Sequence, residues 1–258
     1  MAVDEAILTA YDCRITSLPT LRIYGWNPAG ISLGYFQRTE DVLNRPDCGK
    51  EMIPVVRRMT GGEAIFHANE VTYSISCRTG DLALSRSVKE SFKILTSFII
   101  LAYKTLGLDA FFFSDTPEQK PEKGDCFCFA NREHFDISVQ GRKIGGNAQK
   151  RIKQCIFQHG SIPLRIDTDM IHLLFRANAG DLKQRMISLE EALNRKVSSL
   201  ECSTAMIMAF EKAFSVRLVE QGLTSWEKDC AQRLVKEKYS SRAWNYARNS
   251  AAKETVGI

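Results

Sequence analysis

The sequence predicts a mixed α+β fold, in which strands dominate the first two thirds and helices the last third. Three observations support this prediction: polar and apolar residues alternate over 71–77, a long amphipathic pattern follows Ser87, and helical patterns prevail from Ile166 onward. Runs of strands followed by runs of helices favour a layered α+β architecture over a doubly wound parallel sheet. A length of 258 residues fits one domain, 1–258, with a helical carboxyl-terminal third at about 166–258.

The first 80 residues carry the signals of several strands. A strand, a turn at Gly25 to Pro28 and a second strand are predicted within 21–36. Residues 52–58 form another predicted strand, which is followed by a glycine pair. The alternation over 71–77 is that of a half-buried strand. We therefore expect a sheet with the glycine pair at the end of one strand.

The rest of the chain begins with a long helix and returns to strands before the helical third. Ser87 and Glu90 have the spacing of a capping box, and the core helix that they open ends before Gly107. The polar, proline-containing stretch that follows predicts an exposed loop. Further strands are predicted over 135–139 and 155–164, with a tight turn at Gly141, and further capping boxes stand at 188–191 and 224–227.

Composition limits the possible function classes. Hydrophobic residues make up 44% and charged residues 25% of the chain, as in globular proteins. The longest apolar run is far shorter than the roughly 20 residues of a membrane span, and the amino terminus lacks a secretory pattern, so we expect a cytoplasmic protein. The basic residues behind the net charge of +5 are spread along the chain, which disfavours a nucleic-acid partner but suits an acidic protein partner.

The eight cysteines show no disulfide framework, which favours reduced thiols. Cys126 and Cys128 form a C-x-C pair that could ligate a metal. No second cysteine or histidine pair stands at ligand spacing, so no metal site is predicted.

The segment 57–67 places cations, a hydroxyl, a glycine pair and an imidazole at the end of a strand. Its candidate binding residues are Arg58, Thr60, Gly61, Gly62 and His67. Paired glycines let the backbone approach a ligand closely, and an arginine can neutralise a carboxylate or phosphate. A surface turn after a strand would also explain the two glycines. The complete string favours a ligand cradle.

The segment 128–149 combines a cysteine, a lysine and a second glycine pair. Lys143, which precedes Gly145 and Gly146, can supply a point charge where negative charge develops on an acyl carbonyl. Cys128 follows the proline-rich loop and precedes the strand that leads to Lys143, so we expect both near one cleft. A nearby cation raises the thiolate fraction of a cysteine, and a thiolate attacks thioesters readily. A solvated hairpin lysine and a small buried cysteine are the alternatives that these residues leave open.

Six ordered segments together resemble the lipoate-attachment superfamily, which includes lipoate-protein ligases, octanoyltransferases and biotin ligases. They are MAVDEAIL at 1–8, LRIYGWNPAGISLGYFQ at 21–37, RRMTGGEAIFHANEVTYSI at 57–75, CFANREHFDISVQGRKIGGNAQ at 128–149, QHGSIPL at 158–164 and KYSSRAWNYAR at 238–248. The resemblance implies the mixed sheet flanked by helices of class II aminoacyl-tRNA synthetases and biotin ligases.

Within this superfamily the sequence is most similar to the LipM-type octanoyltransferases. Glu63 stands where lipoate ligases usually carry a third glycine, and Cys128 stands where LipM-type enzymes place their nucleophile. The Gly-Arg-Gly-Arg type loop of biotin ligases is absent. The transferase branch is therefore favoured.

The resemblance implies a function in lipoate biosynthesis and protein lipoylation. Cys128 would take an octanoyl group from acyl carrier protein as a thioester, and a lysine of a lipoyl domain or glycine-cleavage H protein would accept it as an amide. Both protein partners are typically acidic. Lys143 would polarise the acyl carbonyl. The acyl cleft would be lined by Arg58, Thr60, Gly61, Gly62, His67, Gly145 and Gly146. No metal, cofactor, membrane or nucleic acid is implied.

Three other functions remain open at this point. The first is an ATP-dependent lipoate-protein ligase, which would need ATP and Mg²⁺, and the second is octanoyl transfer between lipoyl proteins. The third is a non-catalytic relative that binds acyl or lipoyl proteins. Two departures from the family pattern support the third: relatives usually have a strand before the segment at 1–8, and Ala68 replaces the usual acidic residue after the histidine. The partner that orients His67 cannot be identified from the sequence.

Overall fold

The structure, a computed structural model, describes residues 1–44, 53–82, 84, 85, 87–115, 135–176 and 182–247. Its helices are α1 (Ala2–Asp12), α2 (Thr39–Val42), α3 (Val88–Thr105), α4 (Thr168–Leu174), α5 (Leu182–Arg185), α6 (Leu189–Leu193), α7 (Ser199–Phe214), α8 (Ser225–Leu234) and α9 (Arg242–Asn245). Its strands are β1 (Thr20–Tyr24), β2 (Gly30–Leu33), β3 (Val55–Arg57), β4 (Ile65–His67), β5 (Glu70–Arg78), β6 (Ala110–Phe112), β7 (Ile137–Val139), β8 (Arg142–Lys143), β9 (Gly146–Ile152) and β10 (Cys155–Pro163).

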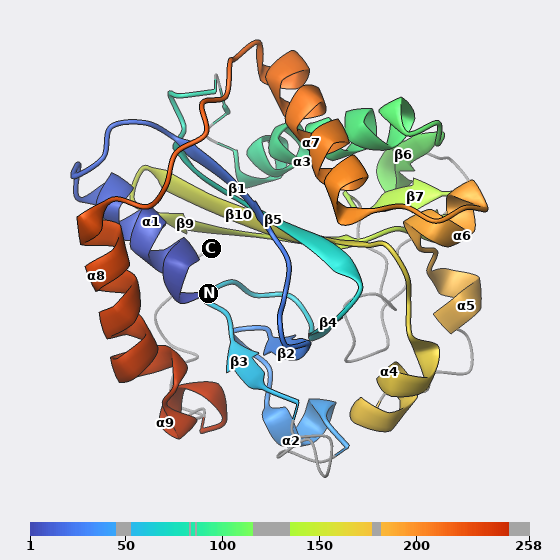
Figure 1. The fold of residues 1–258 in the computed structure, drawn as a ribbon, viewed down its shortest axis with the longest axis horizontal. Coiled ribbons are helices and arrows are strands. Elements are labelled where there is room, and N and C mark those ends of the chain that lie inside the picture. The colour runs from blue at the N-terminus through green and yellow to red at the C-terminus, as the bar shows by residue number, and fades with distance from the viewer. Residues whose placement is uncertain (45–52, 83, 86, 116–134, 177–181, 248–258) are drawn as a thin grey trace.

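A four-stranded antiparallel sheet lies at the centre, in the order β1-β5-β10-β9. Two three-stranded sheets accompany it: β3-β2-β4, where β2 and β3 are parallel, and the antiparallel β6-β7-β8. Figure 1 shows α3 and α7 on one side of the central sheet and α1 with α8 on the other. The predicted α+β class, with a mixed sheet flanked by helices, is confirmed.

The central strand β5 is covered on both faces. Its apolar side chains, such as Tyr73 and Ile75, pack with α3 and α7 in the largest hydrophobic cluster. Its polar side chains Thr72, Ser74 and Ser76 are also buried, with at most 4% exposure. The expectation of a half-buried strand is therefore wrong, because a polar layer that includes α1 covers the face that the alternation assigned to solvent.

The long helix α3 begins where the sequence predicted. The Ser87 side chain accepts the N–H of Glu90, which caps the first turn. Leu95 and Ile99 are buried in the core as expected, whereas Val88 at the first turn is 57% exposed. The capping box at Thr224 and Glu227 is complete, with both reciprocal bonds present.

The strands β4, β6 and β9 were not predicted. The sequence of β9 is Gly-Asn-Ala-Gln-Lys-Arg-Ile, which has neither clear alternation nor enrichment in β-branched residues. Its strand form depends on pairing with β10 along its whole length. Among the described residues, no helix has the length and apolar character needed to cross a membrane.

Candidate active site

The first candidate segment is a turn between β3 and β4 that lies on the polar face of the central sheet. Thr60 Oγ1 lies 2.7 Å from Nε2 of His159 on β10. Ala148 is the residue of β9 that pairs with His159. Gly62 has a φ of +82°, which favours glycine, and a Cβ built there would lie 3.9 Å from the Ala148 side chain. The turn of the first segment thus lies beside β9, which belongs in part to the second segment.

A glycine that faces this turn permits a close approach between two backbone stretches. A Cβ on Gly34, which follows β2, would overlap the carbonyl oxygen of Gly62. The backbone N–H of Tyr35 donates to the carbonyl oxygen of Thr60 at 2.8 Å. Gly34 therefore permits the packing of this turn against the end of β2.

The two arginines at the start of the segment bind protein carbonyls. Arg58 is 1% exposed and its guanidinium donates to the carbonyl oxygens of Ser32, Gly61 and Glu63. These bonds fix the turn from inside. The guanidinium of Arg57 donates to the carbonyl oxygens of residues around Gly34 and in α9, so it ties the segment to the C-terminal helices.

His67 is buried at the end of β4 with both ring nitrogens occupied. Its Nε2 lies 2.7 Å from the Ser32 hydroxyl, and its Nδ1 lies 2.7 Å from a Glu70 carboxylate oxygen. Its ring stacks on Trp26 with centroids 4.0 Å apart. The partner that the sequence could not identify is thus Glu70, three residues further on.

The second candidate segment contributes a buried ion pair. Lys143 Nζ lies 2.6 Å from Asp136 Oδ2, and the two side chains are 3% and 8% exposed. Gly145 has a φ of +78°, and a Cβ there would come within 2.5 Å of the Ser161 carbonyl oxygen. The hydroxyl of Ser161 donates to the carboxylate of Glu70, which also contacts His67. Ser161 and Glu70 therefore link Gly145 to His67. Cys126 and Cys128 lie outside the described residues.

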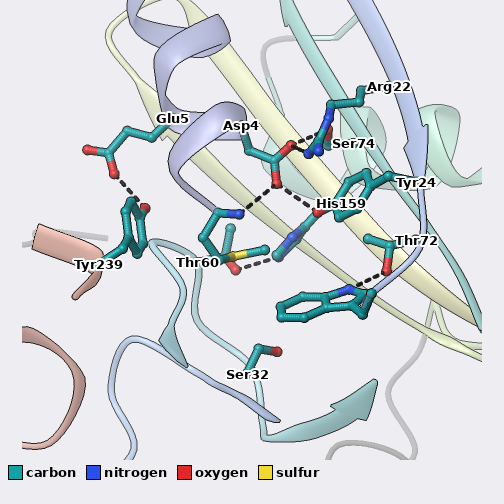
Figure 2. A network of polar contacts seen from close by, with 12 residues as sticks. Asp4, Glu5, Arg22, Tyr24, Ser32, Thr60, Thr72, Ser74, His159 and Tyr239 are labelled. Atoms are coloured by element: carbon teal, nitrogen blue, oxygen red, sulfur yellow. Dashed lines mark hydrogen bonds and ion pairs between the residues drawn. The ribbon is translucent and has the colours of Figure 1, made fainter. Parts of the chain in front are cut away.

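A polar network beside the site is shown in Figure 2, with Thr60 and His159 in contact below the carboxylate of Asp4. Asp4 accepts bonds from Arg22, Tyr24 and Ser74 at 2.7 to 2.8 Å. Burial alone would raise the pKa of Asp4, but the Met1 ammonium, Arg22 and Tyr24 together lower it. The carboxylate therefore stays ionised, and α1 is fixed to the polar face of β5.

His159 is neutral in the folded protein. Burial, followed by the charge of the nearby Arg58, lowers the pKa of His159 to about 3. His159 has a structural role, because it is 7% exposed and its ring contacts the Thr60 hydroxyl of the turn. In the sequence, His159 was marked only by its position within 158–164, one of the six segments that resemble the family.

Two hollows adjoin the site. The larger, of about 510 Å³, lies between the end of β10 and the helices α5 and α6, and the smaller, of about 20 Å³, reaches Glu70. Met186 lines both hollows, and its backbone forms an isolated β-bridge with the backbone of Lys143. None of the predicted site residues lines either hollow. The smaller hollow is lined by Phe66, Ala68 and Glu70, which are close to His67 in the sequence. Sequence reasoning missed Asp136, Glu70 and Asp4 as partners of the site.

Comparison with known proteins gives a consistent result. Residues 1–211 match the model of the lipoyl protein ligase A/B catalytic domain. The chain is 35% identical to octanoyltransferase LipM of Anoxybacillus flavithermus and 33% identical to that of Bacillus subtilis, in each case over 96% of this chain and 93% of the relative. It is also similar to the solved structure of a putative lipoate protein ligase from T. acidophilum with bound lipoic acid, at a TM-score of 0.76 and 25% identity, covering 96% of this chain and 93% of that one.

Proposed function

The chain belongs to the lipoyl protein ligase A/B catalytic domain family, and we infer from its LipM relatives that it is an octanoyltransferase of lipoate biosynthesis. The observation that carries this conclusion is identity of 33 to 35% with proteins of that name over nearly the whole chain. The enzyme is an acyltransferase. The donor, the acceptor and the residues involved are the finer parts of the proposal.

The proposed reaction has two steps, and they use only the octanoyl donor, the enzyme and the acceptor lysine. The Cys128 thiolate attacks the carbonyl carbon of an octanoyl thioester on acyl carrier protein, a new C–S bond forms, and the carrier leaves as its thiolate. The amine of a lysine on a lipoyl domain or glycine-cleavage H protein then attacks this acyl-enzyme. An amide forms, the Cys128 thiolate leaves, and the amine gives up a proton. The thioester is already activated, so the proposal includes no ATP, metal or other cofactor.

Lys143 is the proposed group that stabilises the charge on the acyl oxygen. Its ammonium is fixed by Asp136 in a buried setting, where a charge acts more strongly than in water. A preorganised cation costs little reorganisation when negative charge develops on the carbonyl oxygen. Asp136 thus supports the proposed role by holding the ammonium in place.

The proposed cleft residues have different parts in this reaction. Arg58, Thr60 and His67 have polar atoms bonded to the protein, so they shape the wall of the cleft. The glycine pairs at 61–62 and 145–146 let the backbone approach the acyl chain. The proximity of Gly62 to Ala148 supports a single cleft between the two segments. We further propose that residues 1–258 form one catalytic domain, because α8 packs against α1.

The proposed partners and location follow from the function. A net charge of +5 would speed encounter with acidic carrier and lipoyl domains. Both reaction steps use protein-bound acyl groups in the cytoplasm. No nucleic acid or membrane takes part in the proposed reaction.

The main alternative is an ATP-dependent ligase, which the similarity to the lipoate-bound structure from T. acidophilum favours. The purified protein is incubated with an apo lipoyl domain and either octanoyl carrier without ATP, or free octanoate or lipoate with ATP and Mg²⁺. Transfer from the carrier without ATP supports the proposal. A strict requirement for ATP and free acid contradicts it.

The second alternative concerns the donor. The same assay is run with octanoylated H protein in place of octanoyl carrier protein, at equal concentration. We expect a higher kcat/KM with the carrier. A preference for the H protein would instead identify an amidotransferase between lipoyl proteins, and no transfer from any donor would indicate a non-catalytic relative.

A further inference from the structure

Glu70 links His67, at the end of the first candidate segment, to Ser161 on β10, the strand that pairs with β9. One oxygen of its carboxylate accepts from His67 Nδ1 at 2.7 Å and from the Thr72 hydroxyl. The other oxygen accepts from the Ser161 hydroxyl. Glu70 is 8% exposed, so these bonds are made away from bulk water. Each is a charge-assisted bond of the stronger kind.

The bond to Ser161 extends the contact to the second segment. Ser161 stands opposite Gly146 in the pairing of β10 with β9. Its carbonyl oxygen leaves no room for a Cβ at position 145, which is therefore restricted to glycine. A single carboxylate therefore contacts both the His67 ring and the residue of β10 that faces Gly146. Movement of Glu70 would change both walls of the proposed cleft together.

The bonds around His67 also select its tautomer. An ionised carboxylate only accepts hydrogen bonds, so Nδ1 carries the proton and donates it to Glu70. In the neutral ring the lone pair of Nε2 is then left for the hydroxyl hydrogen of Ser32, 2.7 Å away. Arg58 donates to the same hydroxyl oxygen at 3.2 Å, which is consistent with Ser32 donating toward the ring.

The order hydroxyl, imidazole and carboxylate is that of serine hydrolases, but its use here differs. Ser32 is 1% exposed and binds Arg58 through its hydroxyl and its carbonyl oxygen. A nucleophile must reach a substrate, whereas this hydroxyl is enclosed by protein. The arrangement therefore orients the ring of His67 rather than activating Ser32.

We propose that Glu70 is a positioning residue, which acts through His67 and Ser161 to hold the two walls of the acyl cleft in register. This inference rests on the proposed octanoyl transfer. It also assigns to Glu70 the orienting part that an acidic residue directly after the histidine, where this chain has Ala68, would otherwise play.

The first test compares E70Q with the unchanged protein. Glutamine keeps the shape of the side chain but removes its charge, and its amide can offer either an oxygen or an NH₂ to Nδ1. We expect kcat for octanoyl transfer to fall about 10- to 100-fold, since small displacements of aligned groups cost this much. The KM for the octanoyl carrier should stay within about twofold, because docking of the carrier does not depend on this bond.

A matched control is E227Q. Glu227 is 7% exposed and caps α8 through bonds to Thr224, away from the candidate residues. Its loss removes one buried carboxylate from the fold without altering the proposed cleft. We expect kcat of E227Q to match the unchanged protein. Equal losses of kcat in E227Q and E70Q would overturn the positioning role, because they would show a general effect of stability.

The second test reads the tautomer of His67 directly and without substrate. Long-range ¹H–¹⁵N spectra of protein labelled at histidine should show a proton on Nδ1 of His67, and E70Q should lower the share of that form. S161A should keep the tautomer and lose a smaller part of kcat, since it breaks only the link to β10. A proton on Nε2 in the unchanged protein, or the same tautomer and kcat in E70Q, would overturn the inference.

Failure of the proposed function gives a different result. If the unchanged protein transfers no octanoyl group from any donor, the octanoyltransferase assignment fails, whereas the bond between Glu70 and His67 is decided separately by the spectra. The spectra would still report whether Glu70 orients His67. The two outcomes are therefore distinguishable in the same set of samples.

Discussion

The two faces of the central sheet are both buried, but they differ in what holds them together. On one face, side chains of β5 such as Tyr73 pack on α3 and α7, where Phe98 contacts Tyr73 and Phe210 edge to face. On the other, Thr72, Ser74 and His159 are enclosed by polar partners. Burial of apolar surface stabilises the first face, whereas buried polar groups stabilise the second only if each is hydrogen-bonded. We infer that the apolar face secures the fold and that the polar face positions the site.

The largest expected effect is on the apolar face, in the variant F98A. Phe98 is fully buried, so its removal leaves a cavity that should lower the free energy of unfolding by about 3–5 kcal/mol. Urea unfolding measures this loss. At a temperature where the variant is folded, its kcat should be within about twofold of the unchanged protein. A loss of kcat as large as that of E70Q would break the comparison between the two faces.

The next effect concerns the buried ion pair, in the variant K143M. We expect octanoyl transfer to fall about 10²- to 10³-fold, because a preorganised charge is lost from the proposed cleft. The variant also leaves Asp136 buried without its lysine, which should destabilise the fold by about 3–5 kcal/mol.

The double variant K143M/D136N separates these two effects. It removes both charges, so it should recover most of the stability measured by urea unfolding while transfer stays low. Recovery of activity along with stability would show that Lys143 acts only in the fold.

A smaller effect is expected for the pH dependence of stability. The pKa of His159 is about 3 in the folded protein and near its ordinary value of 6.5 in the unfolded chain, so the unfolded state binds the extra proton as pH falls below about 6.5. Between pH 7 and pH 5 the folded state should lose about 2 kcal/mol through this group, at about 1.4 kcal/mol per pH unit.

The variant H159N provides the reference, because asparagine does not titrate. Urea unfolding at pH 7 and pH 5 should show a decrease in the unchanged protein that is about 2 kcal/mol larger than in H159N. Equal decreases would mean that His159 is protonated in the folded state and that the Thr60 contact tolerates a charge.

Much of the fold could be predicted from the sequence where local signals agreed with tertiary packing. The capping residue Ser87 and the apolar face of α3 predicted a core helix, and the alternation over 71–77 located β5. That alternation could not show that the polar face is buried too, since burial of Ser74 depends on Asp4, which lies 70 residues earlier. The strand β9 has no strand signal of its own and forms because β10 offers a paired edge.

The sequence predicts candidate residues for the site, but not the contacts that these residues make. The two glycine pairs marked turns, and Gly62 and Gly145 have the positive φ that such turns require. The partners of Lys143 and His67 could not be predicted, because any nearby carboxylate would satisfy either and only the folded backbone selects Asp136 and Glu70. The partners of Arg58 could not be predicted either, since they are backbone carbonyl groups, which carry no signal in the sequence.

The measurement that tests the central claim most directly is intact mass spectrometry of the protein after exposure to octanoyl carrier protein without ATP. We predict one covalent octanoyl group on the enzyme, absent in C128S and retained in C126S. Addition of an apo lipoyl domain should then move the group to its lysine. An octanoyl group on Cys126, or no adduct together with ATP-dependent lipoylation, would contradict thioester transfer through Cys128.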